Sequence, residues 1–249
     1  MISLVSYSKP VFYSLLDLIY PPYCLRCYKS LINEKCKFIC PDCLQAAESM
    51  RIDIENICLK CGMFLGPASG QRQNCQSCET MHFAFKRNIA FGSYEEALRD
   101  LILIYKYSCE KALTGILSGF LAERIKKEPE IISRINLIMP VPLTKRKKKL
   151  RGFNQSELIA KGLADEFGLL ISINNLIRIK ELPPQAALSR AERINNMKGA
   201  FGILNNSELK DKSVLVVDDV LTTGATAGEI SRILKNAGAK EVYIAVLAR

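Results

Sequence analysis

The feature that most constrains the fold is a short apolar strand that ends in two carboxylates and leads into a helix. Residues 213–217 are mainly valine and leucine, Asp218 and Asp219 follow directly, and a helix-forming segment spans 225–236. Such an apolar run is typical of a strand buried on both faces of a parallel sheet. The pattern therefore predicts a strand, a turn and a helix at the centre of an α/β fold.

The residues of this turn suit a ligand that carries both hydroxyl groups and a phosphate. In open parallel sheets ligands bind beyond the carboxyl ends of the strands, and the N–H groups at a helix N-terminus attract phosphate. Carboxylates bind phosphate poorly but accept hydrogen bonds from sugar hydroxyls. We therefore expect a phosphorylated ribose to be bound by Asp218, Asp219, Thr222, Thr223, Gly224, Ala225 and Thr226.

Other interpretations of this turn fit the sequence less well. The simplest is a strand, turn and helix with a threonine N-cap and two solvated aspartates. A phosphoreceiver domain also has an Asp pair after its first strand, but it needs an acceptor Asp and a Lys on later strands, and only the 30 residues from Val220 to Arg249 follow here. The sequence has no G-x-x-x-x-G-K-[ST] loop, which argues against a P-loop nucleotidase.

Strands and helices alternate from about residue 84 onward. Strands are expected over 87–94, 135–141, 176–179, 213–217 and 242–247, and helices over 98–107, 113–127, 154–167 and 225–236. This order predicts an α/β fold with a mainly parallel sheet and helices on both faces. Residues 180–198 are polar and include Pro183-Pro184, so they are expected to form an exposed, mobile segment.

Residues 1–82 differ in composition and are dominated by cysteine. Eight of the ten cysteines form four C-x2-C pairs, which is the spacing of zinc ligands rather than of disulfides. Consecutive pairing is the default, with a cross-braced arrangement as the alternative. Cys36, Cys109 and His82 are not expected to be ligands. Two structural zinc sites are predicted, one from Cys24, Cys27, Cys40 and Cys43 and the other from Cys58, Cys61, Cys75 and Cys78.

The formal net charge of +10 suggests an anionic partner such as phosphate, nucleic acid or an acidic membrane surface. The sequence has no apolar run of about eighteen residues, so no membrane span is expected. The first twenty residues are interrupted by Lys9, Pro10 and Asp17 and lack a small-residue cleavage site, which favours a short amphipathic helix over a signal peptide. A cytoplasmic location is therefore expected.

A basic run follows the strand expected over 135–141. Six cations occupy seven positions: Lys145, Arg146, Lys147, Lys148, Lys149 and Arg151. One interpretation is a solvated loop. The other is a contact with single-stranded DNA, because neutralising phosphates releases counterions and gives salt-sensitive binding that tolerates many sequences.

The segment 214–226 resembles the phosphoribosyl diphosphate (PRPP) signature of type I phosphoribosyltransferases. Further stretches resemble the ComF family of competence-associated proteins, and so do the four cysteine pairs. These stretches are Met139-Pro140-Val141-Pro142-Leu143, Leu150-Arg151-Gly152-Phe153-Asn154-Gln155-Ser156, and Gln185, Leu188, Arg193, Asn195 and Ala200-Phe201. The resemblance covers nearly the whole chain and implies a double zinc ribbon over 1–82 and a phosphoribosyltransferase domain over 84–249.

The resemblance also implies roles for individual residues. Asp218 and Asp219 would hold the ribose 2′ and 3′ hydroxyls, 222–226 would hold the 5-phosphate, and Mg²⁺ would bridge the ribose and the pyrophosphate. The pyrophosphate loop would include Leu143, Thr144, Lys145 and Arg151, and the flexible loop would bring Arg190 and Arg193 near the diphosphate. The chain departs from the family pattern at Pro184, where a small hydroxylated residue is common, so the details of loop closure are open.

The function implied by the resemblance is that of a ComF-type competence protein. Such a protein binds PRPP and binds or acts on incoming single-stranded DNA during natural transformation, together with competence proteins such as a DNA-translocating helicase. A free-standing phosphoribosyltransferase of nucleotide metabolism, which releases pyrophosphate from PRPP, is the alternative. No residue identifies an acceptor nucleophile, so catalysis and binding alone are both open.

Overall fold

The computed structural model describes residues 21–249 except 33, 35, 53, 67–73, 108–110 and 181–195. The helix expected within the first twenty residues, Cys109, and the flexible loop with Arg190 and Arg193 therefore lie outside the described residues.

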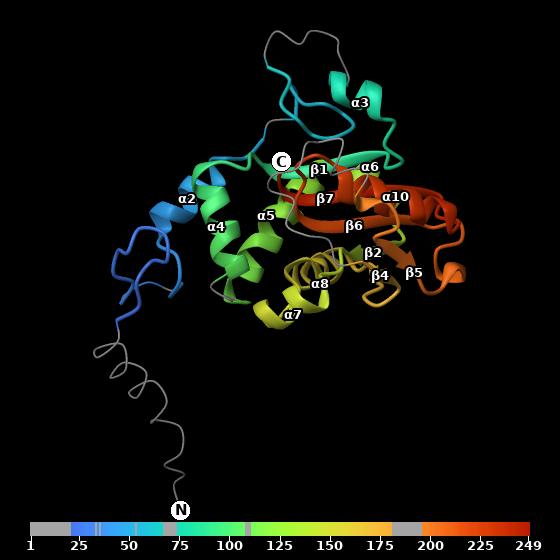
Figure 1. The fold of residues 1–249 in the computed structure, drawn as a ribbon. Coiled ribbons are helices and arrows are strands. Elements are labelled where there is room, and N and C mark those ends of the chain that lie inside the picture. The colour runs from blue at the N-terminus through green and yellow to red at the C-terminus, as the bar shows by residue number, and fades with distance from the viewer. Residues whose placement is uncertain are drawn as a thin grey trace, which may run out of the picture.

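The centre of the fold is a five-stranded parallel sheet with the order β1-β7-β6-β2-β3 (Figure 1). Its strands are β1 (Arg87–Gly92), β2 (Leu137–Pro140), β3 (Leu170–Ile171), β6 (Ser213–Val220) and β7 (Glu241–Ala248). All neighbouring strands are parallel. The predicted α/β class is confirmed, and β6 continues three residues beyond the predicted strand, so that both aspartates belong to it.

Helices cover both faces of the sheet. One face packs against α4 (Glu96–Tyr107), α5 (Thr114–Lys126) and α8 (Gln155–Phe167), and the other packs against α10 (Ala225–Asn236). Because α8 follows β2 and α10 follows β6, the two helices leave neighbouring strands toward opposite faces. Such a divergence opens a crevice at the carboxyl ends of the strands, and the aspartate pair lies there.

A small two-stranded sheet lies outside the main one. It pairs β4 (Leu176–Arg178) with β5 (Phe201–Ile203) in antiparallel fashion. The sequence predicted β4 but missed β5, which is three residues long. The remaining elements that follow β1 are η1 (Lys111–Leu113), α6 (Pro129–Ile132), α7 (Lys145–Arg151) and η2 (Asn206–Glu208).

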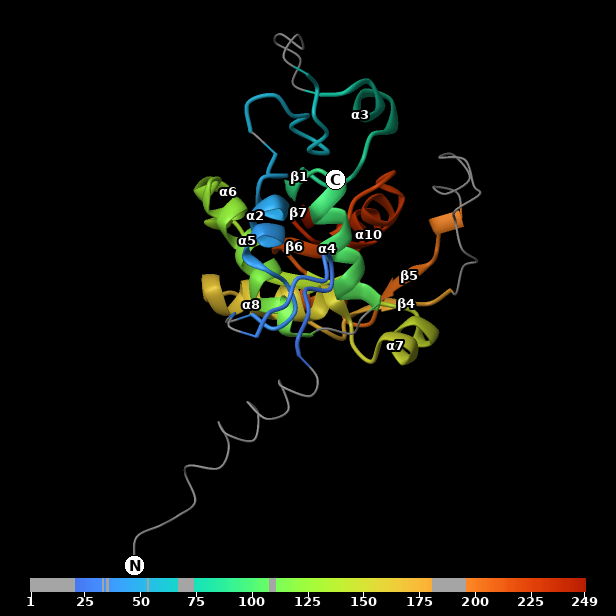
Figure 2. The same cartoon turned by 90° about the vertical axis from the view of Figure 1, so that its left-hand side faces the viewer.

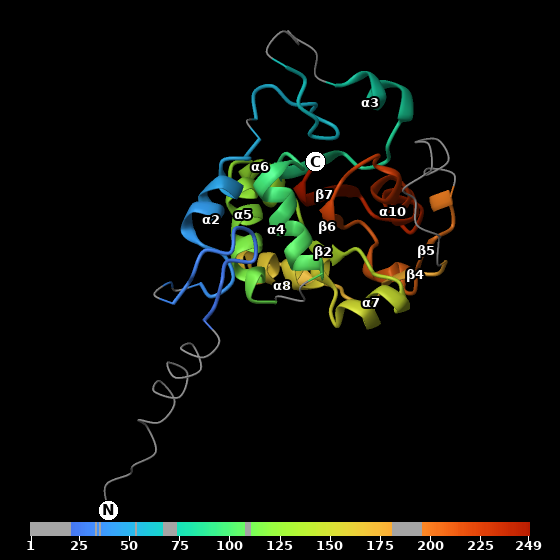
Figure 3. The same ribbon diagram turned by 60° about the vertical axis from the view of Figure 1, so that its left-hand side comes forward.

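The cysteine region adds two segments to this body (Figures 2 and 3). The first carries α2 (Pro41–Glu48) and packs beside α4, where Arg26 forms an ion pair with Asp100 at 3.1 Å. The second carries α3 (Gln76–Met81) and lies beyond β1, where the Asn88 side chain donates to the carbonyl of Cys61 at 2.9 Å. Within the described ranges, no helix combines the length and apolar character that a membrane crossing requires.

Candidate functional site

The carboxylates of Asp218 and Asp219 have different partners at the end of β6. Asp218 accepts hydrogen bonds from the Ser156 hydroxyl at 3.2 Å and from the backbone N–H of Asp219 at 2.9 Å. Asp219 instead forms an ion pair with Lys106 of α4 at 2.9 Å, and both side chains are largely buried. The two acids are therefore held by two different helices, Asp218 by α8 and Asp219 by α4.

Burial raises the pKa of Asp218 to about 7, and the negative charge of Asp219 acts in the same direction. The N–H of Asp219, the ammonium group of Lys106 and the Ser156 hydroxyl oppose this rise. Burial thus favours the protonated form of Asp218, which can donate as well as accept a hydrogen bond. Strongly shifted acids of this kind are frequent at functional sites.

The turn after β6 forms a small cradle at the N-terminus of α10. Gly224 is the N-cap and has a φ of 80°, which glycine adopts without strain. Residues 222–226 line a cavity of about 40 Å³ together with Asp218. The N–H of Ala225 donates to the Thr223 hydroxyl at 3.3 Å, and the N–H groups at a helix N-terminus favour an anion. The cavity has room for a few water molecules.

The segment after β2 begins at this cavity, which Val141 lines. The Thr144 hydroxyl accepts from the N–H of Lys147 at 3.2 Å and so caps α7. The basic run was expected to be a loop, and this expectation is wrong: residues 145–151 form a short helix. Lys145–Lys149 are exposed, whereas Arg151 is buried, donates to Gln155 at 3.1 Å and lies over the ring of Tyr107.

Buried side chains at the start of α8 connect the elements around the site. The Asn154 amide donates to the carbonyl of Val141 at 3.0 Å, and the Gln155 amide donates to the carbonyl of Lys106 at 3.5 Å. Asn154 and Gln155 are both less than a tenth exposed. They fix the ends of β2 and α4 relative to the aspartates.

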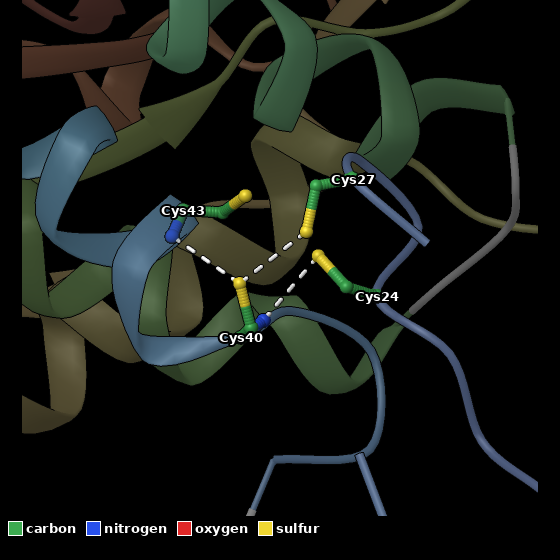
Figure 4. A group of neighbouring side chains, drawn as sticks. All are labelled: Cys24, Cys27, Cys40 and Cys43. Carbon is green, nitrogen blue, oxygen red and sulfur yellow. Dashed lines mark hydrogen bonds between the residues drawn. The ribbon is translucent and has the colours of Figure 1, made fainter. Parts of the chain in front are cut away.

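The eight paired cysteines form two separate groups. The sulfur atoms of Cys24, Cys27, Cys40 and Cys43 lie within 4.8 Å of one another (Figure 4), and so do those of Cys58, Cys61, Cys75 and Cys78. Consecutive pairing is confirmed, and the described cysteines form no disulfides. Backbone N–H groups donate to sulfur in both groups, for example from Cys40 to Cys24 at 3.4 Å and from Cys75 to Cys58 at 3.3 Å. Four convergent thiolates fit a closed tetrahedral zinc site, so each group could hold one ion.

Comparisons with known proteins place the chain in a family. A model of the phosphoribosyl transferase domain matches residues 154–249. Competence protein F of Haemophilus influenzae is 30% identical over 232 residues, which cover 91% of this chain and 96% of that protein. This chain belongs to the ComF family. Competence protein ComFC of Streptococcus pneumoniae and DNA utilization protein YhgH of Escherichia coli K12 are each 28% identical to it over 213 residues, which cover 85% of the chain and 87% and 90% of those proteins, respectively.

A solved purine phosphoribosyltransferase of Pyrococcus horikoshii aligns with 52% of this ComF chain and 68% of its own chain. The two are 24% identical in the aligned part, and the TM-score is 0.33. That agreement is too loose for a comparison of individual sites.

The ComF site contains two residues that the sequence analysis missed, Lys106 and Ser156, and the charge of Arg178 acts on Lys147 nearby. Arg178 lies on β4 with its guanidinium group over the ring of Phe201 at 5.1 Å. Desolvation lowers the pKa of Lys147, and the cations of Arg151 and Arg178 lower it further, whereas Asp219 opposes the shift. Lys147 therefore lies in the electrostatic field of the site. Ser156 was part of the ComF-like stretch without an assigned role, and no local signal marked Lys106 or Arg178.

Proposed function

We propose that this site binds PRPP or a related phosphorylated ribose. The observation that carries the proposal is the pairing of two carboxylates with an anion cradle at the sheet's crevice. Asp218 and Asp219 accept hydrogen bonds from the ribose hydroxyls, and the N–H groups of 222–226 hold the 5-phosphate.

The diphosphate lies toward α7 in this proposal. Its partners are Leu143, Thr144, Lys145 and Arg151 of the pyrophosphate loop, with Arg190 and Arg193 of the flexible loop. Arg151 acts from its buried position through the charge of its guanidinium group. Asp218 and Asp219 are the residues that would hold a magnesium ion together with phosphate oxygens, and the ion would supply positive charge to the diphosphate.

The Lys106 ion pair defines what ligand binding must change. Asp219 is largely buried against Lys106. A sugar hydroxyl therefore reaches the Asp219 carboxylate only when the ion pair separates or when the carboxylate binds Lys106 and the hydroxyl together. Once released, the Lys106 ammonium group is available to an anionic oxygen of the ligand. The proposed ligand supplies both groups, hydroxyl and anion, at one place.

We further propose that the protein binds single-stranded DNA during natural transformation, in the cytoplasm and together with a DNA-translocating helicase. The names of its relatives, competence proteins and a DNA utilization protein, support this role. The exposed cations Lys145–Lys149 on α7 support it physically, because they present positive charge to a phosphate backbone. Whether a transfer reaction follows PRPP binding depends on an acceptor that no described residue identifies.

Titration of the purified protein with PRPP and Mg²⁺ tests the sugar site. Asp218→Ala/Asp219→Ala should lower the affinity for PRPP at least about thirtyfold, because it removes two hydrogen-bonding carboxylates. The matched control is Asp165→Ala/Glu166→Ala, which removes two exposed carboxylates from α8.

The double variant should keep most of its affinity for single-stranded DNA, because the α7 cations remain. Unchanged PRPP affinity in Asp218→Ala/Asp219→Ala would refute the sugar site. Release of pyrophosphate with a base or ammonia as acceptor would instead favour a free-standing transferase.

A further inference from the structure

Arg249, which follows β7, contacts both the second cysteine group and the turn after β6. Its Nη2 donates to the sulfur of Cys61 at 3.4 Å. Its Nη1 donates to the carbonyl oxygens of Leu221 at 3.2 Å and Thr222 at 2.5 Å. One guanidinium group therefore joins a sulfur atom of the cysteine group to the first residues of the anion cradle.

The backbone of Arg249 is fixed on both sides. Its N–H donates to the carbonyl of Gly92 at 3.0 Å, and its carbonyl accepts from the N–H of Tyr94 at 3.1 Å. The N–H of Leu221 in turn donates to the carbonyl of Ala248 at 3.0 Å. The side chain thus extends from a rigid base, and its three acceptors match the planar fork of an arginine.

Phe83 makes a second connection between the same two parts. Its ring packs against the group formed by Cys58, Cys61, Cys75 and Cys78 and stacks on Phe85 at 5.0 Å. The ring also covers Gly224 and Gly228: a Cβ atom would lie 2.7 Å from it at Gly224 and 3.0 Å from it at Gly228. The turn and the first part of α10 therefore pack against Phe83, which in turn packs against the second cysteine group.

The first cysteine group also has an arginine that donates to one of its sulfur atoms, but this arginine contacts a different part of the protein. Arg26 donates to the sulfur of Cys43 at 3.7 Å and to the carboxylate of Asp100 at 3.1 Å. That contact ends on α4 and does not reach the anion cradle. The two groups therefore contact different parts of the protein, although both are built from two C-x2-C pairs.

Charge explains why a bound metal would matter to this contact. A cysteine that binds zinc remains a thiolate, so its hydrogen bond with an arginine is charge-assisted. Metal sites commonly depend on such outer partners. A sulfur atom held by a metal would also hold the Arg249 guanidinium group in place. That group in turn would hold the carbonyl groups of Leu221 and Thr222, which accept its hydrogen bonds. Their orientation sets where the next N–H groups point.

We propose that Arg249 is a positioning residue through which the second cysteine group, with its metal bound, holds the 222–226 turn ready for phosphate. The identity of the phosphate ligand rests on the proposed function, whereas the coupling between the two parts does not. The cysteine region is then part of the sugar site rather than a separate attachment.

Hydrogen–deuterium exchange of the zinc-loaded full chain tests the coupling without any ligand. In Arg249→Met, amides of the turn peptide around 219–228 should exchange faster than in the wild type, while peptides of β2 and α8 should not change. The matched control is Arg26→Met, which removes the corresponding arginine–sulfur contact of the first group and should leave the turn unchanged. Metal content is measured for every sample.

Ribose 5-phosphate affinity is the second readout. Arg249→Met should weaken it about tenfold, the loss expected when one charge-assisted hydrogen bond no longer orders the turn. Arg249→Lys keeps the charge beside Cys61 but lacks the fork, so its affinity should be intermediate. Cys78→Ser should accelerate exchange in the turn, whereas Cys27→Ser in the first group should not.

The outcomes separate the coupling from the proposed function. Equal exchange of the turn in wild type and Arg249→Met would overturn the coupling, and so would faster exchange spread over the whole sheet, which would indicate a general loss of stability. A wild-type chain that shows the exchange effect but does not bind ribose 5-phosphate would retain the coupling and refute the sugar site.

Discussion

At the scale of single residues, Asp218 belongs to the proposed sugar site and lies in an environment that disfavours its charged form. Its side chain accepts from Ser156 and lies beside Asp219, and burial is the main cause of its raised pKa. A carboxyl group whose pKa is higher in the folded chain holds its proton more tightly there than in the unfolded chain. Its effect on stability therefore becomes less favourable as the pH rises toward the folded pKa.

This shift predicts a pH-dependent difference in stability. Between pH 5.5 and pH 8, the free energy of unfolding of the wild type should fall relative to Asp218→Asn by on the order of 2 kcal/mol, because the amide carries no charge at either pH. Denaturant unfolding at both pH values measures it. Asp165→Asn, an exposed change on α8, should show no such difference. A constant difference between wild type and Asp218→Asn would contradict the raised pKa.

The sequence predicted the residues that lie along one segment of chain but not their partners from elsewhere. Asp218 and the turn 222–226 could be found because a strand, two acids and a glycine-containing turn are consecutive. Lys106 could not, because it reaches Asp219 only through the packing of α4.

At the scale of elements, α7 presents five consecutive cations outside the core. Thr144 caps the helix, and Arg151 anchors its end by donating to Gln155. The expected loop is a helix because lysine and arginine have good helix propensity and a threonine N-cap precedes them. The sequence signals for a helix were therefore present, but the family resemblance implied a pyrophosphate loop over these residues.

Replacing the five α7 cations by serine should weaken the binding of single-stranded DNA and reduce its salt dependence. Each lost phosphate contact should lower the slope of log K against log salt by about 0.7. Fluorescence anisotropy at several salt concentrations measures the slope.

The control for α7 must remove the same charge from elsewhere. Five exposed lysines outside α7 serve for this: Lys126, Lys161, Lys210, Lys235 and Lys240. The same reduction of the slope in both variants would show that net charge, and not α7, determines DNA binding.

At the scale of the whole molecule, the cysteine region packs against the α/β body over an apolar surface. Leu31, Ile39 and Ala47 share one buried cluster with Leu98 and Leu101 of α4. The spacing of the cysteines predicted the two ligand groups. It could not predict where they dock, because docking depends on contacts far apart in the chain, such as Arg26 with Asp100.

This packing predicts that residues 84–249 alone are less stable than the full chain. Their α4 would expose apolar side chains that α2 and its neighbours cover. The fragment should unfold at a lower denaturant concentration than the full chain, measured by circular dichroism. Equal midpoints would show that 1–82 and 84–249 are independent domains.

The contact of residues 50–52 with β1 has a consequence for the solubility of the protein. The N–H of Ile52 donates to the carbonyl of Phe91 at 3.0 Å, and the N–H of Ser93 donates to the carbonyl of Met50 at 3.0 Å. β1 is an edge strand, and an uncovered edge invites pairing with other chains and aggregation. The stretch between the two cysteine groups therefore covers the carboxyl end of this edge and shields it from intermolecular strand addition.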